Sequence, residues 1–299
     1  MANAREVKQR IKSVKNISQV TRALQAVSAS KVRKAITLLE KTRPYARKSW
    51  QVLQHIALQP GKETLHPLLC SREEIKELLV VVISGDRGLA GAYNTNIIRS
   101  VREWFEAVDI PVNYLTVGKK GRDLLLRRGE KVIAEFSDLP AEPSYSDIAV
   151  IGRLVVEEFL EERVDEVYLA YTRFINRMNQ TPVLKKLLCL EQGVDTRVKA
   201  FNQVASDWSG SNGSYIFEPD QKMILDQIIP RFVELQIYHA VLEALASEHA
   251  ARMVAMKNAT DNASELADAL QLDYNKARQQ AITNEMLDIA GGAEAISSK

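Results

Sequence analysis

The stretch of this 299-residue chain best suited to chemistry is residues 84–94, SGDRGLAGAYN. It follows the apolar run LLVVVI at 78–83 and precedes residues with helical spacing, a place where many proteins hold a phosphate. Its glycines stand at 85, 88 and 91, which fits neither G-x-G-x-x-G nor G-x-x-x-x-G-K-[ST]. Two interpretations remain open: a tight strand-to-helix connection that uses glycine's tolerance of positive φ, and a phosphate site.

No other residues form a coherent set of catalytic groups, and we expect no bound metal or cofactor. Cys70 and Cys189 lie far apart without a C-x-x-C motif and are expected to be reduced thiols. The four histidines lack metal-ligand spacing, and neither H-E-x-x-H nor G-x-S-x-G occurs. Apolar runs reach about six residues, well short of the roughly 18–20 of a membrane-spanning helix, and we expect no secretory signal.

The charge of the chain is unevenly distributed. The formal net charge is only +2, but residues 1–60 contain 13 Lys and Arg against two acids, Glu6 and Glu40, which makes this segment +11. Residues 61–219 carry −4 and residues 220–299 carry −5. A strongly basic segment of this kind indicates a partner of opposite charge.

The two ends of the chain read as long helices. Residues 3–58 lack Gly, and apolar residues recur at Val7, Ile11, Val14, Ile17, Val20, Leu24 and Val27. Residues 220–290 also lack Gly, with Ile228, Leu235 and Leu242 spaced by seven, and Gly291 and Gly292 are expected to end that helix. Pro44 could kink the first helix. Neither helix fits inside one globular core, so we expect the two to bury their stripes on each other as an antiparallel coiled coil.

The middle of the chain alternates between strand and helix patterns. Strands are expected at 78–83, 111–118, 131–136, 165–174 and 182–190, and helices at 94–108, 122–129 and 146–164. The predicted fold class is therefore α/β, with a long antiparallel coiled coil of the terminal helices and a small, mostly parallel sheet with flanking helices. The expected divisions are a coiled-coil helix at 1–60, an α/β domain at 75–190, an irregular loop at 191–219 and a second coiled-coil helix at 220–299.

Several stretches together resemble one family, the gamma subunit of F-type rotary ATP synthases. Ile282–Ala295, ITNEMLDIAGGAEA, is similar to the family's I-T-x-E-x-x-[DE]-x-x-x-G-A signature. SGDRGLAGAYN is similar to its G-D-R-G-L-x-G-x-[YLF]-N, matched by Gly85, Asp86, Arg87, Gly88, Gly91 and Asn94. Residues 247–263 with 274–283, the N-terminal stretch and RPYA at 43–46 also fit. The resemblance runs from residue 2 to about 296.

The resemblance implies a function. The chain would be the non-catalytic central rotor shaft, which couples proton flow through the membrane sector to ATP synthesis or hydrolysis on a ring of alpha and beta subunits. It would bind no nucleotide itself, and its glycine-rich loop would belong to the globular domain, with packing against the epsilon subunit as a further role. Cys70 and Cys189 would be structural, because nothing like the cysteine-bearing insertion of the chloroplast forms stands at 191–219.

The resemblance also implies contact residues. Beta-subunit contacts are expected at Arg278, Gln279, Thr283, Lys8, Arg10, Lys12, Lys15 and Arg33. The apolar residues Ile282, Met286, Leu287 and Ile289 would sit in a bearing at the top of the ring. Arg43, Tyr45, Tyr215, Phe217 and Glu218 would lie near the membrane c-subunit ring and the epsilon subunit. For each surface position the alternative is an ordinary solvated helix face, and for Phe217 a helix N-terminus with its hydrophobic flank.

Two other functions stay open on the residues alone. A nucleic-acid-binding arm would explain the +11 segment, although that segment has few aromatic residues and no recognised module. A nucleotide-binding enzyme would explain the glycine-rich loop. The expected location is the cytoplasmic face of a bacterial cell membrane as a peripheral protein. Because a basic amphipathic N-terminus also suits a mitochondrial presequence, the matrix side of the mitochondrial inner membrane is the alternative.

Overall fold

The computed structural model describes residues 4–57, 67–69, 72, 74–188 and 221–297. They form two compact units. The first, which we call the coil unit, combines residues up to Ser28 with residues from Met253 onward, and the second, the sheet unit, runs from Ala29 to Arg252. Two helices contribute to both units: α1 (Ala4–Ala57) and α6 (Gln221–Ser297). Pro44 and Pro230 lie inside these helices.

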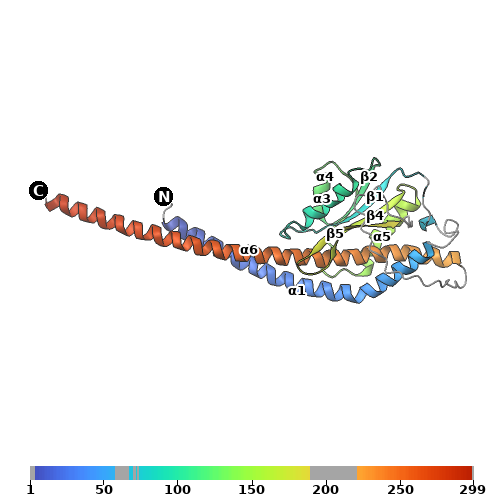
Figure 1. The fold of residues 1–299 in the computed structure, drawn as a ribbon, viewed down its shortest axis with the longest axis horizontal. Helices are drawn as coiled ribbons and strands as arrows, with labels where there is room; N and C mark the ends of the chain where they lie inside the picture. The colour runs from blue at the N-terminus through green and yellow to red at the C-terminus, as the bar shows by residue number, and fades with distance from the viewer. Residues whose placement is uncertain (1–3, 58–66, 70–71, 73, 189–220, 298–299) are drawn as a thin grey trace. The chain divides into compact units, whose positions relative to one another are not determined.

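The sheet unit contains five strands in the order β3-β2-β1-β4-β5 (Figure 1). The strands are β1 (Leu78–Ile83), β2 (Val112–Val117), β3 (Lys131–Phe136), β4 (Glu166–Phe174) and β5 (Gln180–Leu188). The pairs β1–β2, β1–β4 and β2–β3 are parallel, whereas β4–β5 is an antiparallel hairpin. The predicted mostly parallel sheet is therefore confirmed.

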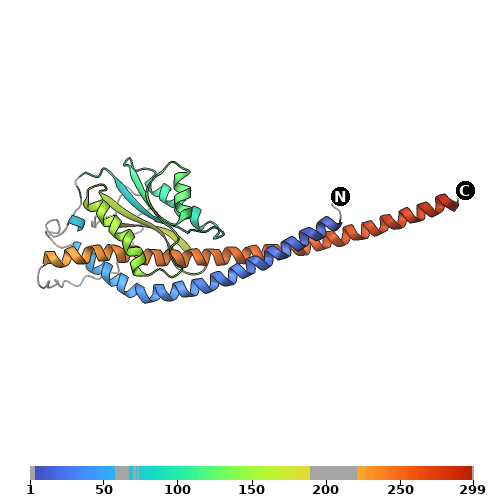
Figure 2. The same cartoon turned by 180° about the vertical axis from the view of Figure 1, so that it is seen from behind.

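Alternate residues of the central strand β1 supply two hydrophobic cores. Leu78, Val80 and Val82 pack with residues of α3 (Tyr93–Phe105) and α4 (Lys119–Leu126) on one face. Leu79, Val81 and Ile83 pack with α5 (Tyr145–Leu160) and α6 on the other face, which Figure 2 shows from behind. All six β1 side chains are buried, as expected for a parallel strand covered on both faces. A short 3₁₀ helix, Pro67–Leu69, precedes β1.

The expected helices are present, with shifted ends that have local causes. The predicted helix 122–129 begins at Lys119 instead, directly after Gly118, whose φ of 103° ends β2. A Cβ on Gly121 would lie 2.5 Å from Ser84 Oγ, so glycine is needed where this helix touches the sheet. The predicted helix 146–164 begins at Tyr145, after a capping box of Ser144 and Asp147, and ends at Leu160.

The middle of α6 is buried on nearly all sides. Between Val233 and Ala250 most residues are buried, including Leu235 and Leu242 of the predicted seven-residue repeat. These two leucines belong to the same core as β1 and α5. The repeat therefore packs in the core of the sheet unit, which the coiled-coil interpretation missed. The segment also buries polar and charged side chains, among them Gln236, Glu243 and Glu248.

The coil unit pairs the first part of α1 with the C-terminal part of α6, antiparallel as predicted (Figure 1). Val7 and Ile11 are buried, and the Thr21 and Thr260 hydroxyls lie 2.7 Å apart between the helices. Residues 4–28 carry a formal charge of +5 and residues 253–297 carry −4, so the two partners are complementary.

Part of the predicted apolar stripe of α1 is wrong. Ile17, Val20 and Val27 are 52%, 59% and 54% exposed, whereas Ser28 is buried and Ser18 and Thr21 are half-buried. The seam continues from Val14 through these small polar residues because they keep the alternating steps of four and three that a coiled coil requires. The apolar residues, spaced mainly by three, drift away from the seam.

The expected end of the C-terminal helix is also wrong. Helix α6 continues through Gly291 and Gly292 to Ser297. Glycine costs about 1 kcal/mol relative to alanine inside a helix, which weakens a helix without ending it. The predicted irregular loop 191–219 lies outside the described residues.

Candidate functional site

The glycine-rich loop makes a tight connection between β1 and α3. The Gly85 N–H donates to Asn94 Oδ1 at 2.9 Å, and Asn94 Nδ2 donates to the Arg87 carbonyl at 3.4 Å. Leu89 and Gly91 have φ values of 61° and 58°. Glycine at position 91 therefore suits the left-handed backbone of the turn.

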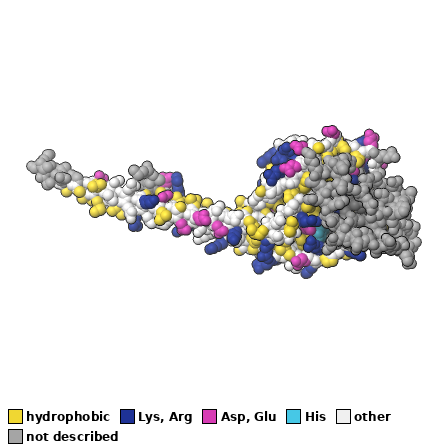
Figure 3. All heavy atoms as spheres, in the orientation of Figure 1, with side chains coloured by type: hydrophobic (Ala, Val, Ile, Leu, Met, Phe, Trp, Pro, Cys, Tyr) yellow, Lys and Arg dark blue, Asp and Glu magenta, His cyan; other side chains and the backbone are white. Residues whose placement is uncertain are grey.

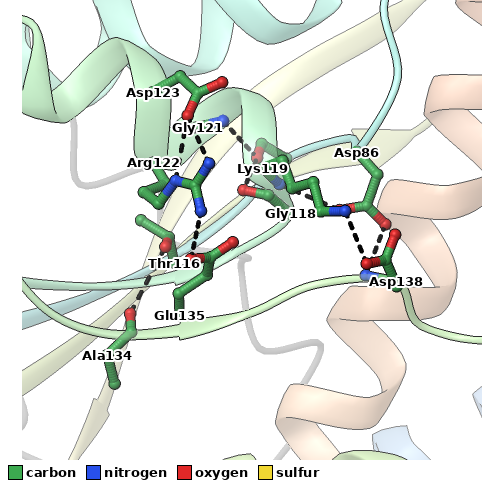
Figure 4. A network of polar contacts seen from close by, with 11 residues as sticks. Asp86, Thr116, Gly118, Lys119, Gly121, Arg122, Asp123, Ala134, Glu135 and Asp138 are labelled. Carbon is green, nitrogen blue, oxygen red and sulfur yellow. Dashed lines mark hydrogen bonds and ion pairs between the residues drawn. The ribbon is translucent and has the colours of Figure 1, made fainter.

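The carboxylate of the loop, Asp86, accepts hydrogen bonds from two backbone amides outside the loop (Figure 4). Asp86 Oδ1 accepts from the Lys119 N–H at the start of α4 at 3.0 Å, and Asp86 Oδ2 accepts from the Asp138 N–H at 3.1 Å. The Lys119 ammonium donates to Asp138 at 2.6 Å. Helix N-terminal amides attract anions, and here the anion is Asp86.

Helix α6 covers the carboxyl ends of β1 and β4. The strand order reverses between β1 and β4. In open α/β sheets, ligands usually bind in the crevice at the carboxyl ends of the strands where this reversal occurs. Here the Tyr93 hydroxyl donates to the Ala244 carbonyl at 3.2 Å, and Ser247 Oγ donates to the Thr172 carbonyl at 3.0 Å. The cavity left between loop and helix is about 50 Å³, against roughly 300 Å³ or more for small-molecule pockets. The geometry favours the tight connection over the phosphate site.

A second polar group in Figure 4 fastens α4 to the edge strand β3. The Arg122 guanidinium contacts Asp123 at 2.7 Å and Glu135 at 2.5 Å. The hydrogen bond from Arg122 lowers the pKa of the Asp123 carboxyl below its usual value. These contacts hold α4 against β3, and both partners of Arg122 are side chains of the same chain.

The predicted beta-contact residues lie on exposed helix surface. Arg278, Gln279 and Thr283 are exposed near the C-terminal end of α6, where Thr283 Oγ1 donates to the Gln279 carbonyl at 2.9 Å. Exposed basic residues of α1 are Lys8, Arg10, Lys12, Lys15 and Arg33. Arg10 forms an ion pair with Glu6 at 2.8 Å. These side chains are exposed, and their roles as partner contacts stay predictions.

The predicted bearing residues form an apolar surface at the end of the coil unit. Ile282, Met286, Leu287 and Ile289 are between 47% and 73% exposed. Hydrophobic side chains gather along this end of α6 in Figure 3. Contiguous exposed apolar residues mark interaction sites on many proteins.

The predicted membrane-ring and epsilon contacts lie mostly outside the described residues. These are Tyr215, Phe217 and Glu218, and Cys70 and Cys189 are likewise not described. Arg43 and Tyr45 are exposed on α1. The charge of Arg43 is one cause of the lowered pKa of His239.

Comparison with known proteins identifies the family. A family model described as ATP synthase matches residues 3–296. A protein of Dehalococcoides mccartyi (strain CBDB1), named ATP synthase gamma chain, is 42% identical over 298 residues that cover 99% of this chain and 100% of the relative. The chain belongs to the ATP synthase gamma-chain family. A gamma chain of Xanthomonas oryzae pv. oryzae (strain PXO99A) is also 42% identical, over 301 residues.

Solved structures carry the same fold. The central stalk and c-ring structure of Tetrahymena thermophila mitochondrial ATP synthase matches with a TM-score of 0.61 and 25% identity, over 80% of this chain and 99% of that one. A structure of Euglena gracilis mitochondrial ATP synthase matches with a TM-score of 0.66 and 22% identity, over 98% and 94%. As a member of the gamma-chain family, the chain is a central-shaft subunit of ATP synthase.

Within the described part of this gamma-family chain, no cluster of three or more His, Cys, Asp or Glu side chains is arranged to hold a metal ion. No described helix combines the length and hydropathy that spanning a bilayer requires.

Sequence reasoning missed a buried polar cluster between α6 and the sheet. His239 Nδ1 lies 3.9 Å from Glu243 Oε1, and the Lys185 ammonium donates to Gln236 Oε1 at 2.7 Å. Burial lowers the pKa of His239 to about 4 and raises the pKa of Glu243. Among the described atoms, His239 Nε2 and Glu243 Oε2 are buried without a hydrogen-bond partner. The spacing of four between His239 and Glu243 in a helix was the available signal.

Proposed function

We propose that the chain is the non-catalytic rotor shaft of an ATP synthase. In this function it couples proton flow through the membrane sector to ATP synthesis or hydrolysis on a ring of alpha and beta subunits. The full-length similarity to bacterial gamma chains carries the proposal. The glycine-rich loop makes a tight strand-to-helix turn with α6 packed beside it, and this supports the absence of a nucleotide site on the chain itself.

The surface of the coil unit supports insertion into a partner. Exposed apolar residues occur on both of its helices, including Ile17, Val20, Leu272 and Met286. Burying such residues is favourable by about 25 cal/mol per Å². The basic residues of α1 would meet acidic surfaces of the beta subunits. Each exposed ion pair contributes only about 0–1 kcal/mol, so many of them can guide a turning shaft without holding it at one angle.

Rotation would act on the catalytic sites through differential contact. An asymmetric shaft can shift a beta subunit between states only as far as it contacts those states differently. Further partners in this proposal are the epsilon subunit and the c-subunit ring, contacted near Arg43 and Tyr45. The location would be peripheral, on the cytoplasmic face of a bacterial cell membrane, and nucleic acid is not among the partners.

Reconstitution tests the proposal. The purified chain is mixed with alpha and beta subunits, and complex formation and ATP hydrolysis are measured. We expect a stoichiometric complex whose turnover requires this chain, while the isolated chain neither binds nor hydrolyses ATP. A folded chain that forms no complex and gives no stimulation would contradict the shaft function, and salt-dependent DNA binding would then be measured.

A matched pair of variants locates the contact. Gln279→Ala should lower turnover because it removes a proposed contact with the beta subunit. Gln280→Ala changes the same residue type at the next exposed position, about 100° around the helix, and should leave turnover unchanged. Equal effects of the two variants would contradict the placement of this contact.

A further inference from the structure

We propose that the glycine-rich loop and one face of α6 form a clip that fixes α6 against the sheet about the axis of the helix. The clip consists of Gly85, Tyr93 and the carbonyls of 87 and 88 on one side, and Ala244, Ser247, Glu248 and Arg252 on the other. Its purpose is to pass torque between the sheet and α6 without slippage. This inference rests on the proposed shaft function, in which residues 84–94 would help to hold α6 in place on the sheet.

The four α6 positions of the clip lie on one side of the helix, because Ser247 and Glu248 follow Ala244 by three and four residues and Arg252 follows Glu248 by four. Ala244 accepts from the Tyr93 hydroxyl, Ser247 donates to the Thr172 carbonyl, and Glu248 and Arg252 meet the loop itself. The helix is thus held by polar contacts over two turns.

Glu248 explains why position 85 is glycine. A Cβ on residue 85 would lie 2.7 Å from Glu248 Oε1 and 2.8 Å from its carboxyl carbon. The backbone φ of Gly85 is not positive, so the close approach of Glu248 is the reason for glycine here. Glu248 cannot move aside freely, because it is ion-paired with Arg252 and the two side chains are only 10% and 14% exposed.

Arg252 reaches the loop from the next turn of α6. Its Nε and Nη2 each donate to the Gly88 carbonyl at 3.3 Å, and Nη2 also donates to the Arg87 carbonyl at 3.5 Å. Arg252 Nη1 lies 3.3 Å from His249 Nδ1 on the same helix. The guanidinium therefore joins the Glu248 carboxylate to the backbone of the loop, and a planar five-donor group suits such bridging.

Hydrophobic packing alone would fix the helix less well. The core shared by α6, β1 and α5 holds the helix to the sheet, but hydrophobic contact is non-directional and tolerates small rotations. Hydrogen bonds weaken steeply with angle, and charge-assisted bonds are stronger than neutral ones. The clip therefore supplies the resistance to rotation that a torque-bearing joint requires.

The first test follows the loop in the isolated full-length chain. Gly85→Ala displaces Glu248, and Arg252→Gln removes the guanidinium. In each variant the amides of residues 85–88 should exchange with solvent about tenfold faster, the effect of losing one charge-assisted hydrogen bond. Arg153→Gln is the matched control for Arg252→Gln, since Arg153 is exposed on α5 and takes no part in the clip. Unchanged exchange in both test variants overturns the clip.

The second test uses the assembled ATP synthase in membrane vesicles. ATP hydrolysis and ATP-driven proton pumping are measured on the same vesicles. The ratio of pumping to hydrolysis should fall severalfold in Gly85→Ala and Arg252→Gln but not in Arg153→Gln. A merely structural role predicts that hydrolysis and pumping fall together with complex yield, and this result would overturn the proposal. Failure of the unmodified chain to assemble would instead refute the shaft function, while the exchange test would still report on the clip.

Discussion

At the scale of single residues, the buried cluster around His239 makes stability depend on pH. His239 faces Glu243 on α6, Lys185 on β5 and Arg43 on α1, and the pKa of Glu243 also responds to Arg173 on β4. Burial is the largest cause of the lowered His239 pKa, followed by the positive charges of Lys185 and Arg43. The folded protein therefore holds His239 neutral at a pH where the unfolded chain takes up a proton.

The sign of the effect follows from that difference. His239 has a pKa of about 4 when folded and 6.5 when unfolded, so its contribution to stability is complete above about pH 6.5 and is lost as the pH falls toward 4. Lowering the pH from about 7.5 to about 5 should cost on the order of 2 kcal/mol from this residue alone. His239→Leu should remove this part of the acid sensitivity, measured as the free energy of unfolding in urea.

His249 should make the stability depend on pH in the same way as His239. Burial, Arg252 and Lys31 lower the pKa of His249 to about 4 as well, so His249→Leu should also flatten the acid limb and the two effects should add. Acid sensitivity that is unchanged in His239→Leu would show that His239 is not held neutral in the folded chain.

At the scale of elements, the register of the coiled-coil seam distinguishes structural from contact residues on α1. Ile11 is 7% exposed and lies in the seam, whereas Ile17 is 52% exposed and lies outside it. Ile11→Ser should lower the free energy of unfolding of the isolated chain by about 2 kcal/mol through lost burial. Ile17→Ser should change it by less than about 0.5 kcal/mol, as for other surface sites.

Assembly with the alpha and beta subunits should depend on the exposed Ile17, although folding does not. If Ile17 contacts the alpha and beta ring, Ile17→Ser should weaken complex formation, measured by titration of labelled chain, although its folding is unimpaired. Equal stability losses in Ile11→Ser and Ile17→Ser would mean that the seam runs through Ile17 after all.

How far the sequence predicts these elements depends on whether local or tertiary forces decide them. The central strand β1 was predictable because a parallel strand buried on both faces is apolar throughout, and β2 and β3 were predictable from their short β-branched runs between helical patterns. The seam of α1 was predictable at Val7, Ile11, Val14 and Leu24. Elsewhere the helix uses Ser18, Thr21 and Ser28, whose burial is imposed by the partner helix and has no signal in hydropathy.

The candidate sites were predictable to a similar degree. The glycine-rich loop could be recognised as a motif, but the reason for Gly85 lies on Glu248, which is distant in sequence. The closeness of His239 to Lys185 on β5 could not be predicted either, because the two residues are distant in sequence. The roles of these side chains depend on which residues lie near them in the fold, and residue type alone does not give that.

At the scale of the whole molecule, the net charge is small but the positive charge is concentrated at the N-terminal end of the sequence. The net charge is +2, yet residues 1–60 carry +11. Within the coil unit the positive charge lies on α1, where residues 4–28 carry +5, and the negative charge lies on α6, so the basic side of α1 should steer association with acidic partner surfaces. The Debye length falls from about 10 Å at 0.1 M salt to about 3 Å at 1 M, so this steering should weaken as salt rises.

The last prediction concerns the rate of association with alpha and beta subunits, measured by stopped-flow fluorescence at several salt concentrations. The rate should fall with salt, and a variant with Lys8, Lys12 and Lys15 all changed to Gln should show both a slower rate at low salt and a shallower salt dependence. Lys119, Lys120 and Lys131 of the sheet unit, changed together to Gln, make the same change in net charge outside the basic segment. If the two triple variants behave alike, overall charge sets the rate, and the distribution of charge along α1 has no part in it.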